Sequence, residues 1–488
     1  MPFLFEYIWC TMGKKLIQIS FLSTILLTIQ SCKKLVDVNP PSSSINSGNV
    51  YQNDATAIAA ITNLYVNISK SDLISGGISS LSLFPGLSAD ELALYPGATI
   101  NSVQYYYQNS LTSNNVNNPD YWSSFYKEIS VANSAIEALT ASSSLTSAVK
   151  QQLIGEAKFI RAFCYFYLVN LYGDVPLVLT TDYKVNSTLV RTSKDEVYKQ
   201  IITDLKEAKN LLSINFLDAS LINATNERVR PTKWAATALL ARIYLYLKQW
   251  PEAETEASSI IDNNALFDTV SLANVFLKNN KEAIWQLQPV NAGWNTEDAK
   301  VFLLPASGPD QGGHPVYLSS QVINNFEIGD QRKAIWVDTV IQSGKKYYYP
   351  AKYKNANYND PVTEYQTVFR LSEQYLIRAE ARANGAGTGM SGAIADLSRI
   401  RIRAGLSIYN GSVSQEAVIN AIQHERQVEL FTEWGHRWFD LKRSGKIDEV
   451  MSIVTPIKGG KWDVNWQWYP ISSKELLLNP NLKQNTGY

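Results

Sequence analysis

Residues 151–173, QQLIGEAKFIRAFCYFYLVNLYG, decide the fold class of this chain. Apolar side chains recur there at alternating spacings of four and three, at Leu153, Ala157, Ile160, Cys164, Tyr167, Leu168 and Leu171. This is the spacing of one buried helix face, and Gly173 follows as a stop. Residues 121–139 carry a similar stripe. The two segments predict a helical hairpin around a turn at 140–147.

More helices follow from the same period. The pattern predicts a second pair at 193–212 and 231–248, and further helices at 365–384, 392–404 and 415–434. Residues 235–261, AATALLARIYLYLKQWPEAETEASSII, alternate small and large side chains as a tetratricopeptide-like unit does. Short strands fit 282–288, 345–354 and 466–471. The sequence therefore predicts a mainly α protein with helical hairpins as its scaffold and a less regular, loop-rich half with a few short strands.

Two long stretches lack a clear period, residues 71–118 and residues 286–320. Loops of this length in a compact protein usually serve a function. They carry aromatic residues that could stack on flat ligand faces such as sugar rings, namely Tyr95, Tyr105, Tyr106, Tyr107, Trp294 and Tyr317. The alternative is that these rings cap the core beneath the loops. We predict that they contribute to a ligand-binding face.

The N-terminus has the three-part form of an export signal. Lys14 and Lys15 precede fifteen apolar or small polar residues, which end at Ser31-Cys32. This stretch is too short to span a membrane. We expect residues 1–31 to be a signal peptide, with Met12 as a possible true start, and Cys32 to be lipidated. Alternatives are a plain signal peptide or an anchor helix. Residues 33–48 are rich in Pro, Ser and Asn and predict a tether of roughly 20–25 Å end to end.

Composition excludes some partners. Lys plus Arg and Asp plus Glu both number 44, so there is no electrostatic case for nucleic acid. Beyond residue 31 only Cys32 and Cys164 remain. We expect no disulfide framework, and a buried free thiol at Cys164.

No catalytic or metal-binding set emerges. His424-Glu425 begins like the H-E-x-x-H zinc motif, but Val428 stands at the second ligand position. Residues 385–392, GAGTGMSG, follow a predicted helix and suit a glycine-rich connector better than a phosphate loop. Glu425, Glu429 and Glu433 recur every four residues. Paired carboxylates suggest glycosidase chemistry, but nearby arginines, Arg426, Arg437 and three in 399–406, favour structural ion pairs. We predict no enzyme, no metal and no cofactor.

Several long motifs, in order, resemble the SusD/RagB family of outer-membrane lipoproteins. The resemblance spans nearly the whole chain after residue 31, and its motifs are SCKKLVDVNP (31–40), EAKFIRAFCYFYLVNLYGDVPLV (156–178), RPTKWAATALLARIYLY (230–246), FRLSEQYLIRAEARA (369–383), DLSRIRIRAGL (396–406), ERQVELFTEWGHRWFDLKRSGK (425–446) and YPISSKELLLNPNLKQNTGY (469–488).

The resemblance implies a SusD-like fold, with an N-terminal region at 49–270 carrying the tetratricopeptide-like helices and a C-terminal RagB/SusD region at 271–488. It implies lipid anchoring in the outer membrane, facing the cell exterior, beside a TonB-dependent transporter of the SusC type. There the protein would capture an oligosaccharide or polysaccharide and pass it to the transporter. The alternative is a peptide-binding or purely scaffolding partner. The shared motifs are scaffold motifs, so the resemblance assigns no ligand residue.

Overall fold

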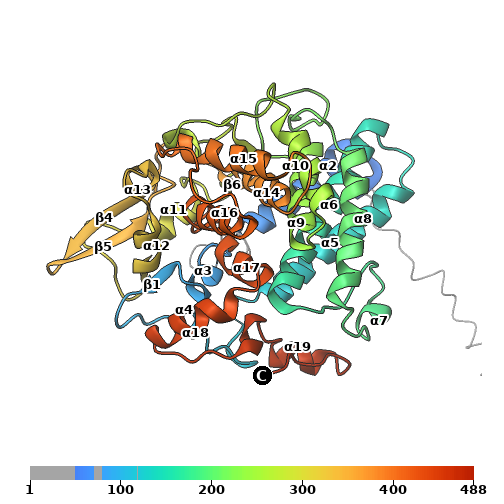
Figure 1. Ribbon diagram of the computed structural model, residues 1–488. Coiled ribbons are helices and arrows are strands. Elements are labelled where there is room, and N and C mark those ends of the chain that lie inside the picture. The colour runs from blue at the N-terminus through green and yellow to red at the C-terminus, as the bar shows by residue number, and fades with distance from the viewer. Residues whose placement is uncertain (1–49, 71–79, 118) are drawn as a thin grey trace, which may run out of the picture. The chain divides into compact units, whose positions relative to one another are not determined.

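The computed structural model of the protein describes residues 50–70, 80–117 and 119–488 (Figure 1). Contacts divide the chain into two units, 1–50 and 51–488, and every described residue except Val50 belongs to the second unit. The predicted signal segment, Cys32 and the tether lie outside the described residues. The predicted division near residue 270 stays a prediction.

Long helices form the scaffold of the second unit, and they pack in sequence: α5 on α6, α6 on α8, α8 on α9, α9 on α10, and α10 on α14 (Figure 1). Their bounds are α2 (Asp54–Lys70), α5 (Tyr121–Ala141), α6 (Ser147–Tyr172), α8 (Lys194–Leu211), α9 (Lys233–Tyr246), α10 (Trp250–Ile261), α14 (Leu371–Ala383), α15 (Gly389–Arg403) and α16 (Gln415–Glu429). The predicted mainly α class and both predicted helix pairs are confirmed.

Helix α6 is the centre of this scaffold, and nearly all of its second half is buried. Gly155 lets α8 approach closely, because a Cβ there would lie 2.9 Å from the Leu212 side chain. Arg161 holds the same pair of helices together through two hydrogen bonds to Asp204 of α8, at 2.6 and 2.8 Å. Cys164 is a buried free thiol, as predicted.

A two-stranded antiparallel sheet packs on α6. Its strands are β2 (Ala283–Leu287) and β6 (Gln366–Arg370), and every residue of both is buried. The ring of Phe163 on α6 lies 5.6 Å from Trp285 on β2 and 6.1 Å from Phe369 on β6. The predicted strand at 282–288 is confirmed. The predicted helix at 365–384 is wrong at its start, because pairing with β2 holds 366–370 extended before α14 begins.

Short elements fill the rest of the unit. They are α3 (Phe84–Ser88), β1 (Leu92–Leu94), α4 (Asn101–Tyr107), α7 (Tyr183–Asn186), α11 (Glu297–Phe302), β3 (Val316–Leu318), α12 (Ser320–Asn325), α13 (Gln331–Ile335), β4 (Val337–Gln342), β5 (Lys345–Pro350), α17 (His436–Arg443), α18 (Ile447–Ile457) and α19 (Ser473–Leu478), with the 3-10 turns η2 (Val50–Gln52), η4 (Leu272–Asn274) and η5 (Val464–Gln467). Strand β1 pairs with β3, and β4 with β5, both antiparallel. The β4–β5 hairpin projects at the left of Figure 1.

These short elements correct the prediction of two structureless loops. The described part of 71–118 contains α3, β1 and α4, and 286–320 contains α11 and β3. Their length explains the error, because elements of three to seven residues show too little period to stand out. The predicted glycine-rich connector is confirmed for 385–388, which join α14 to α15 with Gly385 and Gly387 at positive φ. Residues 389–392, predicted to belong to the connector, already form the first turn of α15.

Two predicted elements near the C-terminus also differ. The helix predicted at 415–434 ends at Glu429, because Thr432 and Trp434 adopt positive φ values of 53° and 49° and turn the chain away. The strand predicted at 466–471 is wrong. The Asp463 side chain accepts from the Asn465 N–H and starts η5 there, and the irregular chain after it reaches α6 through one hydrogen bond, from Tyr469 N to Leu171 O.

Candidate functional site

Helix α4 carries three of the predicted binding rings, Tyr105, Tyr106 and Tyr107. Successive helical residues point about 100° apart, so three consecutive rings cannot share one face. Tyr106 is fully buried, with its ring 4.4 Å from that of Phe84 and 5.1 Å from that of Tyr469. Burial raises the pKa of Tyr106 well above its ordinary value. Tyr106 is therefore a core residue, whereas Tyr105 and Tyr107 are half-buried.

Tyr95 and Tyr317 converge on Tyr347 of β5, a ring that sequence reasoning missed. The ring centroids of Tyr95 and Tyr347 lie 6.0 Å apart, and those of Tyr317 and Tyr347 lie 4.9 Å apart. Pairing of β1 with β3 sets Ala93 opposite Tyr317 and so brings the two predicted loops together. Lys345 Nζ lies 5.6 Å from the Tyr317 ring and 4.8 Å from the Tyr347 ring. We call Tyr95, Tyr317 and Tyr347 the tyrosine cluster.

Tyr107 lies beside the tyrosine cluster. Burial raises its pKa, and Tyr317 raises it further. The signal for Tyr347 was present in the sequence, since the predicted strand at 345–354 contains Lys345-Lys346-Tyr347-Tyr348-Tyr349. Alternation along a strand sends neighbours to opposite faces, and Tyr347 is buried where Lys346 is exposed.

Trp294 belongs to a different group of rings. Its centroid lies 5.3 Å from that of Tyr358, which is 61% exposed, and Lys300 Nζ lies 4.6 Å from the Trp294 ring. Gly293 permits this contact, because a Cβ there would lie 2.6 Å from both Tyr358 and Asn359. We call the two rings the Trp294–Tyr358 pair. The prediction of one exposed face is wrong for Tyr106, which is fully buried. For Trp294, Tyr105 and Tyr107 it stays a prediction.

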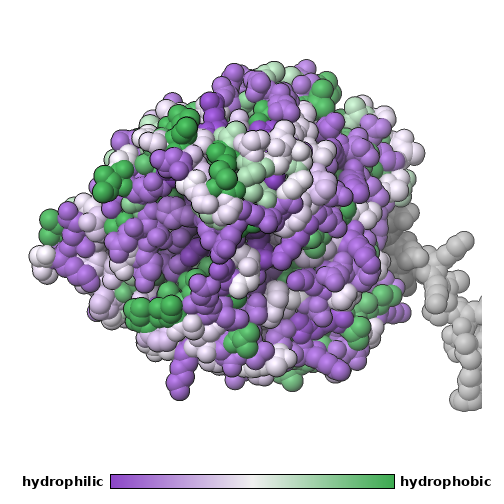
Figure 2. Space-filling view, in the orientation of Figure 1, coloured by the Kyte–Doolittle hydropathy of each residue, from purple (hydrophilic) through white to green (hydrophobic). Residues whose placement is uncertain are grey.

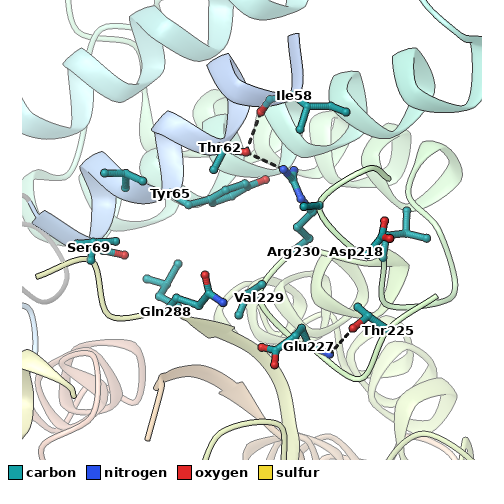
Figure 3. Close-up of a pocket in the computed structure, with 15 residues that line it drawn as sticks. Ile58, Thr62, Tyr65, Ser69, Asp218, Thr225, Glu227, Val229, Arg230 and Gln288 are labelled. Carbon is teal, nitrogen blue, oxygen red and sulfur yellow. Dashed lines mark hydrogen bonds between the residues drawn. The ribbon is translucent and has the colours of Figure 1, made fainter. Parts of the chain in front are cut away.

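A cavity of about 360 Å³ opens between α2, the segment 217–230 and the end of β2 (Figure 3). We call it the α2 cavity. Part of its wall is aliphatic, from Ile58, Val66, Leu217, Val229, Leu287 and Val290. Polar side chains of Thr62, Tyr65, Asp218, Thr225, Glu227, Arg230 and Gln288 also line it. Sequence reasoning missed this site, because its walls come from three segments far apart in the chain.

Arg230 organises one wall of the α2 cavity. Its Nη1 donates to Glu156 Oε2 at 2.8 Å, and its Nη2 donates to Thr62 Oγ1 at 2.6 Å. The Tyr65 hydroxyl donates to the same Glu156 oxygen at 2.6 Å, and its ring faces the guanidinium at 6.0 Å. Figure 3 shows the Tyr65 and Arg230 side chains pointing toward one another. This network fixes the shape of the wall and pairs its charge.

The carboxylate stripe of α16 proves to be an ion-pair cluster. Glu425 and Glu429 are fully buried and Glu433 nearly so. Arg332 donates to Glu425 at 2.6 Å and to Glu429 at 2.9 Å, and Arg370 donates to Glu429 and to Glu433. Structural pairing with arginine is therefore confirmed.

Some of the partners differ from those predicted. Arg403 of the 399–406 segment does bind Glu429, and Arg401 lies 3.5 Å from Glu425. Arg426 instead binds Asp440, and Arg437 binds Asp90. Arg332 and Arg370 were missed, because they come from short elements, the helix α13 and the strand β6, that the helical period did not reveal.

Within 50–70, 80–117 and 119–488, no group of three or more His, Cys, Asp or Glu side chains is placed to hold a metal ion. In the described part of the chain, no helix has both the length and the apolarity that crossing a membrane requires. On the face shown in Figure 2, apolar residues form small separate patches among polar ones.

Two family models match the sequence. One matches residues 37–245 and is described as "Starch-binding associating with outer membrane". The other matches residues 339–488 and is described as "SusD family". Together the two matches cover most of the chain.

Curated relatives and solved structures agree with these matches. "SusD-like protein P2" of Formosa agariphila is 28% identical over 420 residues, covering 75% of this chain and 80% of its own. A SusD superfamily protein from Bacteroides vulgatus has the same fold, with a TM-score of 0.76 and 23% identity over 89% of this chain and 99% of its own. A structure titled "Laminarin binding SusD-like protein" has a TM-score of 0.74 and 24% identity, over 90% and 100% of the two chains.

Proposed function

Because the chain belongs to the SusD/RagB family, we propose that it captures an oligosaccharide or polysaccharide at the cell surface and delivers it to a SusC-like, TonB-dependent transporter. Proteins of this family are binding proteins rather than enzymes, and they associate with the outer membrane. The observation that carries the proposal is the match over residues 37–245 to a family described as starch-binding at the outer membrane.

The ring groups support a carbohydrate ligand. Aromatic faces offer large contact area with little entropy to lose, and sugar rings present flat apolar faces that stack on them. Trp294 is half-buried and its partner Tyr358 is mostly exposed, so this pair presents ring surface to solvent. Tyr95 and Tyr317 are half-buried over a buried Tyr347, which makes a second supported ring surface.

The anchor and the transporter complete the proposal. The predicted signal segment, residues 1–31, is followed by Cys32, whose thiol would be the acylation site, and a lipid anchor at the start of a short tether would hold the binding unit near the membrane. The body would then face the exterior, beside the transporter. The second candidate is a peptide-binding or scaffolding partner of the transporter. It would use charged pockets and backbone pairing rather than exposed rings.

A binding screen tests the choice of ligand class. The mature chain should bind at least one polysaccharide in a panel that includes laminarin and starch, measured by calorimetry, and should not bind a panel of oligopeptides. Trp294→Ala should weaken that binding by about 1–3 kcal/mol, roughly 5- to 150-fold, because the variant removes a stacking ring. Its melting temperature should stay near that of the wild type.

Two further variants sharpen the test. Tyr317→Ala tests whether the tyrosine cluster contributes to glycan binding. A triple alanine variant at 105–107 is unsuitable for this purpose, because it also removes the core ring of Tyr106. Trp466→Ala is the matched control, since Trp466 is also half-buried but lies in η5. Wild-type affinity in both Trp294→Ala and Tyr317→Ala would show that neither ring group binds glycan. Peptide binding without polysaccharide binding would favour the second candidate.

A further inference from the structure

The α2 cavity has an unbalanced negative charge on its walls. Its volume of about 360 Å³ falls within the usual range for small-molecule sites. The charged residues that line it are Asp218, Glu227 and Arg230. Arg230 is paired at 2.8 Å with Glu156, which is fully buried and does not line the cavity. The charge of Arg230 is therefore neutralised behind the wall, and the two carboxylates remain.

Glu227 has neutral partners only. Its Oε1 accepts from Asn279 Nδ2 at 2.8 Å, and its buried Oε2 has no hydrogen-bond partner among the described residues. Tyr365 lies within reach of the charge, because burial raises the pKa of Tyr365 and Glu227 raises it further. An amide and a phenol do not balance a negative charge. A carboxylate at the wall of a partly enclosed site without a counter-ion is unfavourable, so this wall favours a cation.

Asp218 adds a second negative charge to the same cavity. Its carboxylate accepts from the N–H and the hydroxyl of Ser220 and from the Asn223 amide. These hydrogen bonds lower the pKa of Asp218 to about 2, so the group is ionised at neutral pH. Arg228 adjoins Glu227 in the chain but donates to two main-chain carbonyl oxygens instead. The cavity thus presents two carboxylates to an occupant.

The rest of the cavity suits an apolar body. Burying apolar surface stabilises a complex roughly in proportion to its area. The hydroxyls of Thr62 and Tyr65 are already bonded, to Arg230 and to Glu156. In Figure 3 the Glu227 carboxylate lies apart from the Tyr65–Arg230 pair. The aliphatic part of the wall is formed by Ile58, Val66, Leu217, Val229, Leu287 and Val290.

We propose that the α2 cavity binds an organic ammonium ion, with the aliphatic side chains around its apolar body and the Glu227 carboxylate as its counter-ion. Two sources carry this chemistry, a free amine and the lysine side chain of a peptide. A neutral sugar supplies neither the charge nor the apolar body. The inference goes beyond the proposed glycan capture and does not depend on it, because the tyrosine cluster and the Trp294–Tyr358 pair do not line this cavity.

Three matched small molecules test the need for a positive charge. Phenethylamine, phenethyl alcohol and hydrocinnamate carry the same phenyl ring on a short chain, and their end groups are positive, neutral and negative at pH 7. Ligand-observed NMR titration of the mature chain would measure the three dissociation constants. The amine should bind at least about tenfold more tightly than the alcohol, and the carboxylate most weakly, because only the amine balances the charge of the wall.

Variants assign the preference to the cavity. Glu227→Gln removes the charge and keeps an oxygen that can accept from Asn279. It should weaken phenethylamine binding about tenfold and leave the affinity for the alcohol unchanged. Glu252→Gln is the matched control, since Glu252 is exposed on α10 and lies outside the cavity lining. Val66→Trp fills the cavity from α2 and should weaken both ligands; if it fails to fold, Val290→Phe fills the cavity from the other wall.

The outcomes are distinct from those of the glycan screen. Absence of binding by all three molecules, equal affinity for the amine and the alcohol, or tighter binding of hydrocinnamate would each overturn the cavity proposal. An amine preference that survives Glu227→Gln would overturn it as well. N-acetyl-lysinamide separates the two sources, because binding tighter than that of phenethylamine supports a peptide lysine and weaker binding supports a free amine. Polysaccharide affinity should be the same in wild type and Glu227→Gln, so either proposal can fail alone.

Discussion

Glu429→Ala tests whether the buried carboxylates stabilise the fold. Glu429 is fully buried in the last turn of α16, and its carboxylate accepts from Arg332 at 2.9 Å, from Arg370 at 2.5 Å and from Arg403. Burial alone would raise the pKa of Glu429, but Arg403, Arg370 and Arg332 outweigh burial and hold the pKa well below its ordinary value. The carboxylate is therefore ionised at neutral pH. In Glu429→Ala, the guanidinium groups of Arg332, Arg370 and Arg403 stay buried, but each loses one of its carboxylate partners.

The expected loss of folding stability in Glu429→Ala follows from these contacts. Removing one partner of a buried ion pair typically costs about 3–5 kcal/mol. Each arginine keeps another carboxylate, Asp330 for Arg332, Glu433 for Arg370 and Glu282 for Arg403, so none is left wholly unpaired. For a unit of about 440 residues, an unfolding entropy of roughly 2.1 cal/mol/K per residue amounts to about 0.9 kcal/mol/K. If the unit unfolds cooperatively, the melting temperature should fall by about 3–5 °C.

Differential scanning calorimetry at pH 7 measures this shift directly. Glu416→Ala is the matched control, because Glu416 is exposed in the first turn of the same helix. Its loss removes only a favourable helix-dipole contact of about 0.3–1 kcal/mol, or about 1 °C or less. A Glu429→Ala protein that melts with the control would refute the structural role. An unchanged melting temperature together with loss of a hydrolytic activity would make the stripe catalytic instead.

Three further changes probe the anchor, a buried acid and the core. Cys32→Ala should release the protein from membranes into the soluble fraction, because lipid anchoring needs the acylated thiol; membrane retention or an unmodified N-terminus by mass spectrometry would contradict this. Burial and Asp90 raise the pKa of Glu91 to about 8 in the folded chain, whereas its ordinary value is 4.5. As the pH rises from 4.5 to 8, the Glu91 carboxyl of the unfolded chain loses its proton before that of the folded chain does. The folded state therefore loses stability over this pH range. Glu91→Gln should therefore raise the melting temperature more at pH 8 than at pH 5, and an equal shift at both would count against it. Tyr106→Ala should cost about 3–5 kcal/mol in denaturant unfolding, like other large-to-small core changes, and a neutral result would return Tyr106 to the list of surface rings.

Much of the helical scaffold could be predicted from the sequence, since long helices repeat their buried face over several turns. Helix α6 repeats it over seven turns, and its predicted range of 151–172 falls short of the observed start by only four residues. Helix α8 adds a Ser193 N-cap to its period, which fixes its start. Such signals are local and need no knowledge of the rest of the fold.

Predictions failed where distant parts of the chain decide the local structure. Residues 366–370 run into α14 with no Gly or Pro between them, and only pairing with β2 makes them a strand. The end of α16 depends on Trp434, whose indole N–H donates to Thr367 O at 2.6 Å. That hydrogen bond holds the turn after α16, in which Trp434 has a positive φ. Neither partner is visible in a window of local sequence.

The ring groups show why the candidate site was only partly predictable. Composition and loop position singled out Tyr95 and Tyr317 individually, and both are half-buried on one cluster in the structure. The same reasoning also chose Tyr106, because it did not reveal that α4 is a helix and that its middle ring points into the core. Tyr347 and Tyr358 were missed, although each supports a predicted ring. An aromatic residue in a long loop therefore indicates a candidate, and its partner ring, supplied by another segment, decides whether the surface can stack on a sugar.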